Sequence, residues 1–109
     1  LRGSIVGCTP AGAPPSATIT GSEIDFNNAN AGGFNRAAGI WSGGTSSLTL
    51  TNTSLSGNTA LGAFAGALYH SGSGNATITG CTISNNSSGI LGGGIAFFHT
   101  ASATRVLTI

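Results

Sequence analysis

Residues 76–86 read ATITGCTISNN, and residues 48–58 read LTLTNTSLSGN, which is nearly the same pattern. A third copy, ATITGSEIDFN, occupies residues 17–27, and the letters VLTI at 106–109 match the beginning of a fourth. Successive copies follow one another at intervals of 28 or 31 residues. Self-similarity at such a period is typical of solenoid proteins, in which each repeat stacks on its neighbours. The repeated stretch therefore predicts a solenoid.

The local period decides which kind of solenoid to expect. Apolar and polar residues alternate in 76–79, which is the pattern of a strand with one buried face. The alternation slips by one residue at Thr79–Gly80, after which Cys81 and Ile83 point inward. A slip at a small residue is typical of a corner between two short strands.

A second recurring element precedes each copy. It reads GSIV at 3–6, AGIW at 38–41, GALY at 66–69 and GGIA at 93–96. Each coil should therefore contain three short strands, and parallel stacking of coils places neighbouring strands about 4.8 Å apart. We predict one all-β domain over residues 1–109, a parallel β-helix of about three and a half coils, which is either whole or a slice of a longer solenoid.

Stacking places like residues above like, so equivalent positions form columns. The predicted core columns are Ile5, Ile40, Leu68 and Ile95; Ile19, Leu50, Ile78 and Ile109; and Ile24, Leu55 and Ile83. A polar column of Asn27, Asn58 and Asn86 lies at a bend, where we expect the side-chain amides to form a hydrogen-bonded ladder.

The combination of these elements resembles the right-handed parallel β-helix repeats of polymorphic outer-membrane proteins and autotransporter-type adhesins. In those repeats, GGA/I-type elements alternate with segments like TITNCTFSGN, and the matching residues here are 93–95 and 77–86. The chain departs from the pattern at Phe26, where other copies have Gly or Asn, and at Ser22 and Thr53, which replace the Cys. The resemblance implies right-handed coils, but β-helices host lyases, hydrolases, adhesins and scaffolds alike.

The scarcity of charge limits the possible partners. Five of 109 residues are charged, whereas an ordinary soluble domain has roughly a quarter. Three Arg and no Lys cannot line a phosphate backbone, so we expect no nucleic-acid binding. No apolar run approaches the length of a membrane-spanning helix. Without an initiator Met or a signal-peptide pattern, we expect a processed or partial product.

The few reactive side chains do not form a catalytic pattern. Glu23 and Asp25 flank the inward Ile24, roughly 7 Å apart, a separation that would suit a two-carboxylate glycosidase. No third acid or basic neighbour can be placed, so we expect a solvated strand face, with weak cation binding as the alternative. His70 and His99 fall in predicted loops without a partner. We predict no catalytic residue, no cofactor and no metal site.

Cysteine and asparagine residues are candidates for covalent modification. The separation of Cys8 and Cys81 allows a disulfide without implying one, and we expect Cys81 to be a small buried thiol. The acceptor pattern for N-linked sugars occurs at Asn52, Asn75, Asn85 and Asn86.

Two outward-facing arrays are the candidate contact surfaces. The first consists of Thr-x-Thr pairs: Thr18 and Thr20, Thr49 and Thr51, Thr77 and Thr79, continuing to Thr108. It resembles the ice-binding face of β-solenoid antifreeze proteins, although Thr is also a common outward strand residue. The second is an aromatic stripe of Trp41, Tyr69, Phe97 and Phe98, which suits a subunit contact, a glycan or covering loops.

The ends of the repeat suggest a function. Residues 1–5 and 106–109 enter and leave on predicted core strands, so both ends would expose apolar cross-sections and strand edges, which template association. We therefore expect a non-enzymatic, extracellular or cell-surface structural solenoid that self-associates into a filament or forms an adhesin stalk. The alternatives are a module that binds ice or glycans and, less favoured, a polysaccharide-cleaving enzyme.

Overall fold

The computed structural model describes residues 16–29, 35–71, 73–98 and 106–109, and Ile5, Cys8 and His99 lie outside these ranges. Its strands are β1 (Ser16–Thr20), β2 (Asn35–Ala37), β3 (Ile40–Ser42), β4 (Ser47–Thr51), β5 (Ser54–Ser56), β6 (Thr59–Ala60), β7 (Ala63–Ala65), β8 (Leu68–Ser71), β9 (Ala76–Thr79), β10 (Thr82–Ser84), β11 (Ser87–Ser88), β12 (Ile95–Phe98) and β13 (Leu107–Thr108). None of the described residues forms a helix long and apolar enough to cross a membrane.

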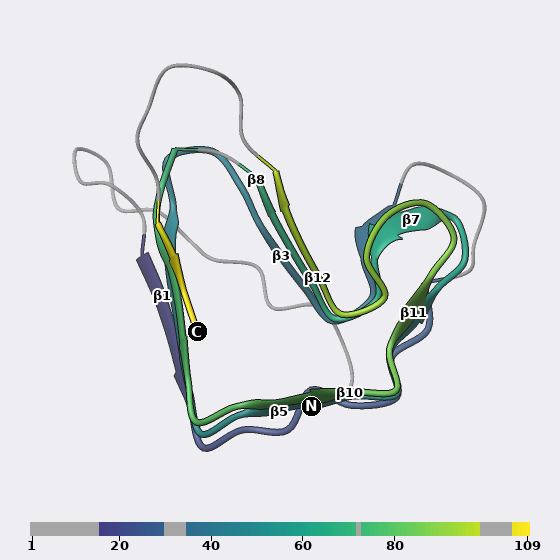
Figure 1. Ribbon diagram of the computed structural model, residues 1–109, viewed down its shortest axis with the longest axis horizontal. Helices are drawn as coiled ribbons and strands as arrows, with labels where there is room; N and C mark the ends of the chain where they lie inside the picture. The colour runs from purple at the N-terminus through teal and green to yellow at the C-terminus, as the bar shows by residue number, and fades with distance from the viewer. Residues whose placement is uncertain (1–15, 30–34, 72, 99–105) are drawn as a thin grey trace.

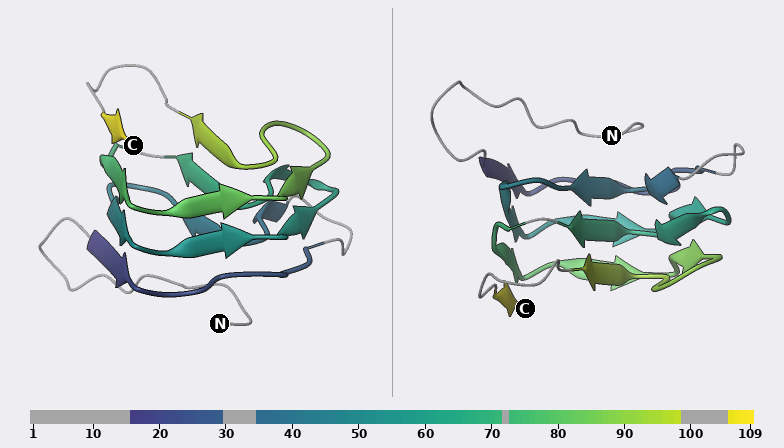
Figure 2. Two further views of the ribbon diagram at one scale, coloured as in Figure 1. Left: turned by 60° about the horizontal axis from the view of Figure 1, so that its bottom comes forward. Right: turned by 90° about the horizontal axis from the view of Figure 1, so that it is seen from above.

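The strands wind into stacked coils, and every strand pair is parallel. The sheets have the orders β1-β4-β9-β13, β5-β10, β6-β11, β2-β7 and β3-β8-β12. Seen along the stack, the first and last of these sheets face each other across the core, and β5-β10 forms a third side (Figure 1). From β5-β10 the chain passes through β6-β11 and β2-β7 before it returns to the last sheet. Side views show the coils as successive layers (Figure 2). The predicted all-β fold of stacked parallel coils is confirmed.

The prediction of three strands per coil was incomplete. The coil that runs from β4 to β8 contains five strands, because β6 and β7 form in residues 59–65. In these two short strands Ala60, Ala63 and Ala65 are buried and alternate with less buried residues. We call the segment of β6 and β7 the arm; its small alanines allow the two strands to pack closely. The alternating pattern in this segment is too short to predict a strand from the sequence.

The core columns follow the backbone register. Ile19 pairs with Leu50, which pairs with Ile78, and all three are buried. The same holds for Ile40 and Leu68 on the opposite sheet. Ile24 and Leu55 are buried in the same cluster. In the last described coil Ile83 pairs with Leu55 and Ile95 with Leu68, and both pack against this cluster.

Ile109 does not belong to the core, so its predicted role as a buried member of the column with Ile78 was wrong. Its side chain is 81% exposed. β13 ends at Thr108, which pairs with Thr77, so Ile109 follows the end of the strand. Within the described residues no strand lies on the far side of β13 to cover it.

The asparagine column forms a continuous ladder at one bend. The side-chain nitrogen Nδ2 of Asn27 donates to Oδ1 of Asn58 at 2.9 Å, and Nδ2 of Asn58 donates to Oδ1 of Asn86 at 3.0 Å. The backbone N–H groups of Asn27 and Asn58 donate to the same two oxygens. Nδ2 of Asn58 also donates to the backbone carbonyl of Ile24. The fully buried Asn58 amide therefore supplies hydrogen-bond partners to backbone groups at the bend.

Phe26 occupies a strained corner of the backbone. Its φ is 56°, and Gly57 and Asn85 at the equivalent corners of the next coils have φ values of 66° and 54°. Gly and Asn tolerate this left-handed conformation, but a bulky residue does not. The Phe26 side chain is nevertheless 83% exposed and lies against Gly57, whose added Cβ would meet the ring at 2.7 Å.

Replacing Phe26 by Asn is therefore expected to stabilise the protein. The change relieves a left-handed conformation that costs a side chain about 1–2 kcal/mol, and removes little buried surface. Urea unfolding of both chains measures the gain. The reciprocal change Asn85→Phe should destabilise the protein by a similar amount, and an unchanged stability in both variants would contradict the strain.

Candidate functional site

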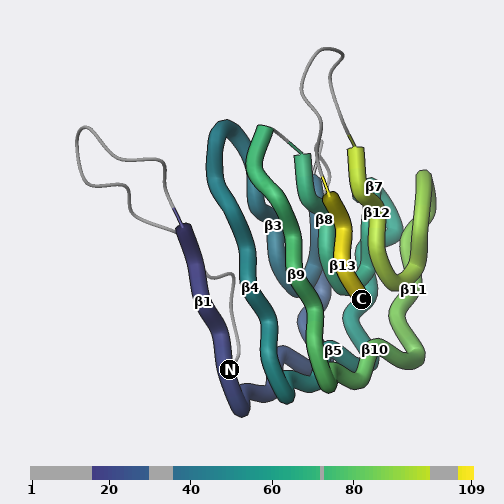
Figure 3. The backbone as a smooth tube through the Cα atoms, turned by 60° about the vertical axis from the view of Figure 1, so that its left-hand side comes forward, coloured from purple at the N-terminus to yellow at the C-terminus, as the bar shows by residue number. Residues whose placement is uncertain are grey.

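The described surface has one extended array of equivalent side chains, which we call the threonine face. It consists of the outward-facing residues of β1, β4, β9 and β13, which are Ser16, Thr18, Thr20, Ser47, Thr49, Thr51, Thr77, Thr79 and Thr108. Every one is a Ser or Thr. These four strands lie side by side in Figure 3.

The backbone register aligns these side chains in two threonine ranks. Thr18 pairs with Thr49 and Thr49 with Thr77, while Thr20 pairs with Thr51. Thr108 extends the first rank and Thr79 the second. The alternating residues of the same strands are apolar and enter the core, so the pleat that buries one set also exposes the other.

The described part of the chain leaves the threonine hydroxyls of the threonine face unused. Within the described residues, no hydrogen bond joins any of the seven Thr hydroxyls to another protein group. Because an exposed hydroxyl is both a donor and an acceptor, these groups are available to whatever lies against the face.

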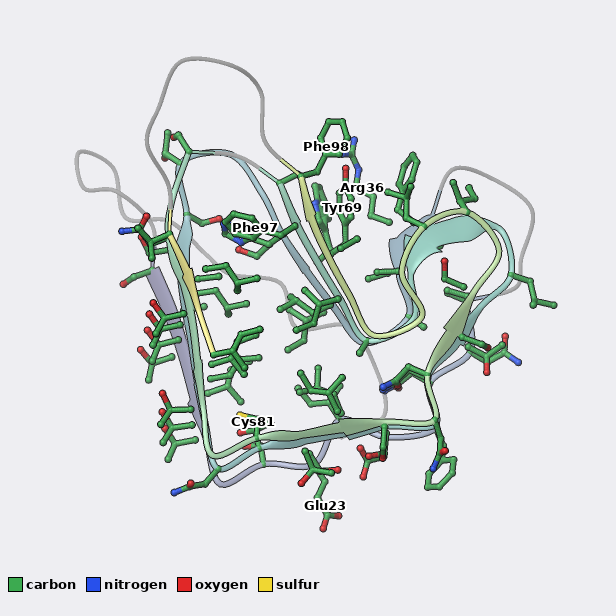
Figure 4. The ribbon with its side chains drawn as sticks, in the orientation of Figure 1. Glu23, Arg36, Tyr69, Cys81, Phe97 and Phe98 are labelled. Atoms are coloured by element: carbon green, nitrogen blue, oxygen red, sulfur yellow. The ribbon has the colours of Figure 1, made fainter. Side chains whose placement is uncertain are left out.

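The neighbouring sheet β5-β10 behaves differently, and its expected solvated acidic strand face was wrong for Asp25. The half-buried Asp25 carboxylate accepts hydrogen bonds from Ser54 Oγ at 3.0 and 3.1 Å and from the Ser56 backbone N–H at 2.6 Å. Ser56 Oγ in turn lies 3.0 Å from Ser84 Oγ. The coil spacing brings these groups together, whereas Glu23 points outward (Figure 4). Asp25 thus serves the stacking of coils.

The predicted aromatic stripe is smaller than the sequence suggests. Tyr69 is only 5% exposed, because its ring stacks on Phe64 with centroids 5.3 Å apart. Trp41 is half-exposed, but the Arg36 guanidinium carbon lies 4.8 Å from the centroid of its ring. Phe98 is the other exposed member. Sequence reasoning missed Arg36, which lies on β2, and Phe64, which lies on β7, because neither segment was predicted to be a strand.

Phe97 and His70 were misplaced by the sequence reading. His70 does not lie in a loop: it pairs with Phe97 in the register of β8 and β12, and both rings point inward (Figure 4 labels Phe97). The two rings stack with centroids 5.1 Å apart. His70 is fully buried, its Nε2 lies 2.9 Å from the Gly74 carbonyl oxygen, and no described residue bonds its Nδ1. Strand β8 extends further than predicted, so its alternation carries His70 into the core.

Tyr69 is covered, Phe97 stacks on buried His70, and Arg36 lies over one face of Trp41, so the described residues do not form a continuous aromatic platform. Stacking on a sugar ring needs an open aromatic face, so this geometry favours the glycan alternative less than the sequence did. Among the described residues, no group of three or more His, Cys, Asp or Glu side chains is arranged to hold a metal ion.

Cys81 is partly buried in the described structure. It packs against the core cluster, and its sulfur accepts from the Thr53 backbone N–H at 3.4 Å. The sulfur also lies 3.4 Å from the Thr79 carbonyl. Ser22 and Thr53, the residues that replace this Cys in the other coils, are small enough to keep the same corner.

The stacked parallel coils agree with a family comparison. The model of the right-handed β-helix region matches residues 4–106. The chain belongs to the right-handed β-helix family. Comparisons with curated proteins and with solved structures returned no significant match. Members of such a family share the winding of the backbone, and their functions depend on the side chains that each one displays.

Proposed function

We propose that this β-helix is a non-enzymatic structural module, extracellular or at the cell surface, that associates end to end with further copies into a filament or stalk. The single observation that carries the proposal is the uneven burial of the core columns along the stack. In the middle coil Thr53, Leu55 and Leu68 are fully or almost fully buried. Their counterparts in the last described coil are only partly covered.

Those counterparts are Cys81, Ile83 and Ile95, each of which continues a core column. In the described part of the chain, β10, β12 and β13 each have a strand neighbour on one side only. A surface of this kind combines half-covered apolar side chains with backbone groups that can continue a parallel ladder. A further coil of the same type fits it, and a second copy of the chain can supply one.

The electrostatics of the chain favour such stacking. With five charged residues and a formal net charge of +1, two copies repel each other weakly. Natural edge strands are commonly protected by charged side chains, especially Lys, and the sequence has no Lys.

Charge placed at the last described coil should therefore stop assembly. The double variant Val106→Lys, Ile109→Lys changes two exposed residues beside β13, so folding should be preserved. In sedimentation experiments we expect the apparent mass of the wild-type protein to increase with its concentration. Electron micrographs of the wild type should show filaments. The variant should sediment as a single chain of 10.5 kDa.

A matched control changes two exposed residues that lie outside the last described coil. Leu61, between β6 and β7, and Ser73, between β8 and β9, are both exposed. The double variant Leu61→Lys, Ser73→Lys adds the same charge and should assemble like the wild type. Wild-type chains that stay monomeric at every concentration, or equal effects of the two double variants, would refute end-to-end stacking.

A further inference from the structure

The threonine face presents hydroxyls that no described protein group uses, in register over four strands. We propose that this face binds ice, with the ordered water of a crystal plane as the ligand. The inference concerns the side of the solenoid rather than its ends, and it is independent of the proposed self-association.

The spacing of the two ranks is suited to a crystalline ligand. Equivalent threonines repeat about 4.8 Å apart along the stack, and the two ranks lie about 7 Å apart across each strand. Water oxygens in planes of ice repeat at comparable intervals in two directions. A ligand without such a repeat would engage one or two of these side chains, whereas an ice plane can engage the whole array.

The array is also held rigidly. Threonine is branched at Cβ, which restricts its χ1 rotamers on a strand. The residues between the threonines are anchored in the core, for example Leu48 and Leu50 on β4. The asparagine ladder fixes the spacing of successive coils at the bend that follows β5 and β10. Side chains that are already ordered lose little conformational freedom when they meet a solid surface.

The chemistry of the face favours water over other solid ligands. None of its described side chains is charged, so it lacks the ionic groups that a mineral surface requires. None is aromatic, so it lacks the platforms on which crystalline polysaccharides stack. Each threonine offers a methyl group beside a hydroxyl, which matches the alternation of voids and oxygens on an ice plane.

The serine row of β5-β10 provides an internal comparison. There the hydroxyls also repeat along the stack, but Ser54 bonds to Asp25, and Ser56 lies within hydrogen-bonding distance of Ser84. Those hydroxyls are oriented by each other and by a carboxylate. No contact of this kind with a described residue engages the threonine hydroxyls, so an external lattice can set their orientation.

The experiment measures thermal hysteresis and the shape of ice crystals in solutions of the purified chain. The wild type should depress the freezing point below the melting point and produce faceted crystals. Thr49→Lys, in the middle of the first rank, should lose both properties. The matched control Thr82→Lys lies on the exposed outer side of β10 and should retain them.

Circular dichroism establishes that each variant is folded. If Thr49→Lys fails to fold, Thr20→Lys provides the same test, because this exposed residue of β1 tolerates a long side chain. Absence of hysteresis in the wild type would overturn the proposal. So would hysteresis that persists in folded threonine-face variants, or that is lost equally in the Thr82→Lys control.

Discussion

Leu50→Ala is expected to lower the free energy of unfolding by about 2–5 kcal/mol, the range for truncating a buried leucine. Leu50 is fully buried and lies between Ile19 of the preceding coil and Ile78 of the next. Truncation therefore opens a cavity that faces two coils. Urea unfolding followed by circular dichroism measures the change.

The control comes from the same repeat position. Ile109→Ala changes the residue that sequence alignment places in the Leu50 column, but this side chain is largely exposed. Its truncation should alter the free energy of unfolding by no more than about 0.5 kcal/mol. Similar losses in the two variants would show that burial along this column does not follow the described register.

Asn58→Ala should have a comparably large effect. The substitution removes the acceptor for the Asn27 side-chain amide and the donor for both the Ile24 carbonyl and Asn86 Oδ1. Each buried polar group left without a partner costs about 1–3 kcal/mol. We expect a loss of about 2–4 kcal/mol in the free energy of unfolding, measured by urea denaturation.

Two further variants separate the ladder from simple loss of volume. Asn58→Asp keeps the size but cannot donate to Ile24 or Asn86 when ionised, so it should destabilise at neutral pH at least as much as alanine. Asn75→Ala removes one exposed bond, from the Val106 N–H to Asn75 Oδ1, and should cost about 1 kcal/mol or less. An Asn58→Asp variant as stable as the wild type would argue against the ladder.

Several features of the fold are readable directly from the repeat. Stacking in register requires each coil to present the same residue type to the next, so Ile19, Leu50 and Ile78 recur at matching positions. The same requirement makes the column of Asn27, Asn58 and Asn86 visible in the letters alone. The threonine ranks follow as well, because a strand that buries every second residue must expose the others.

Other features depend on contacts between segments whose sequences show no matching pattern. The arm of β6 and β7 is built from short, alanine-rich strands, so the covering of Tyr69 by Phe64 could not be anticipated. The inward position of His70 depends on how far β8 continues before its loop.

The sequence by itself determined the winding of the chain, its core columns and the composition of the threonine face. Only the tertiary structure decided which polar groups are already engaged. It bonds Asp25 to the serines of the next coil, while it leaves the hydroxyls of the threonine face without described protein partners. The reason is physical: periodicity specifies the direction of a side chain, but hydrogen bonding depends on the distance between side chains on different coils.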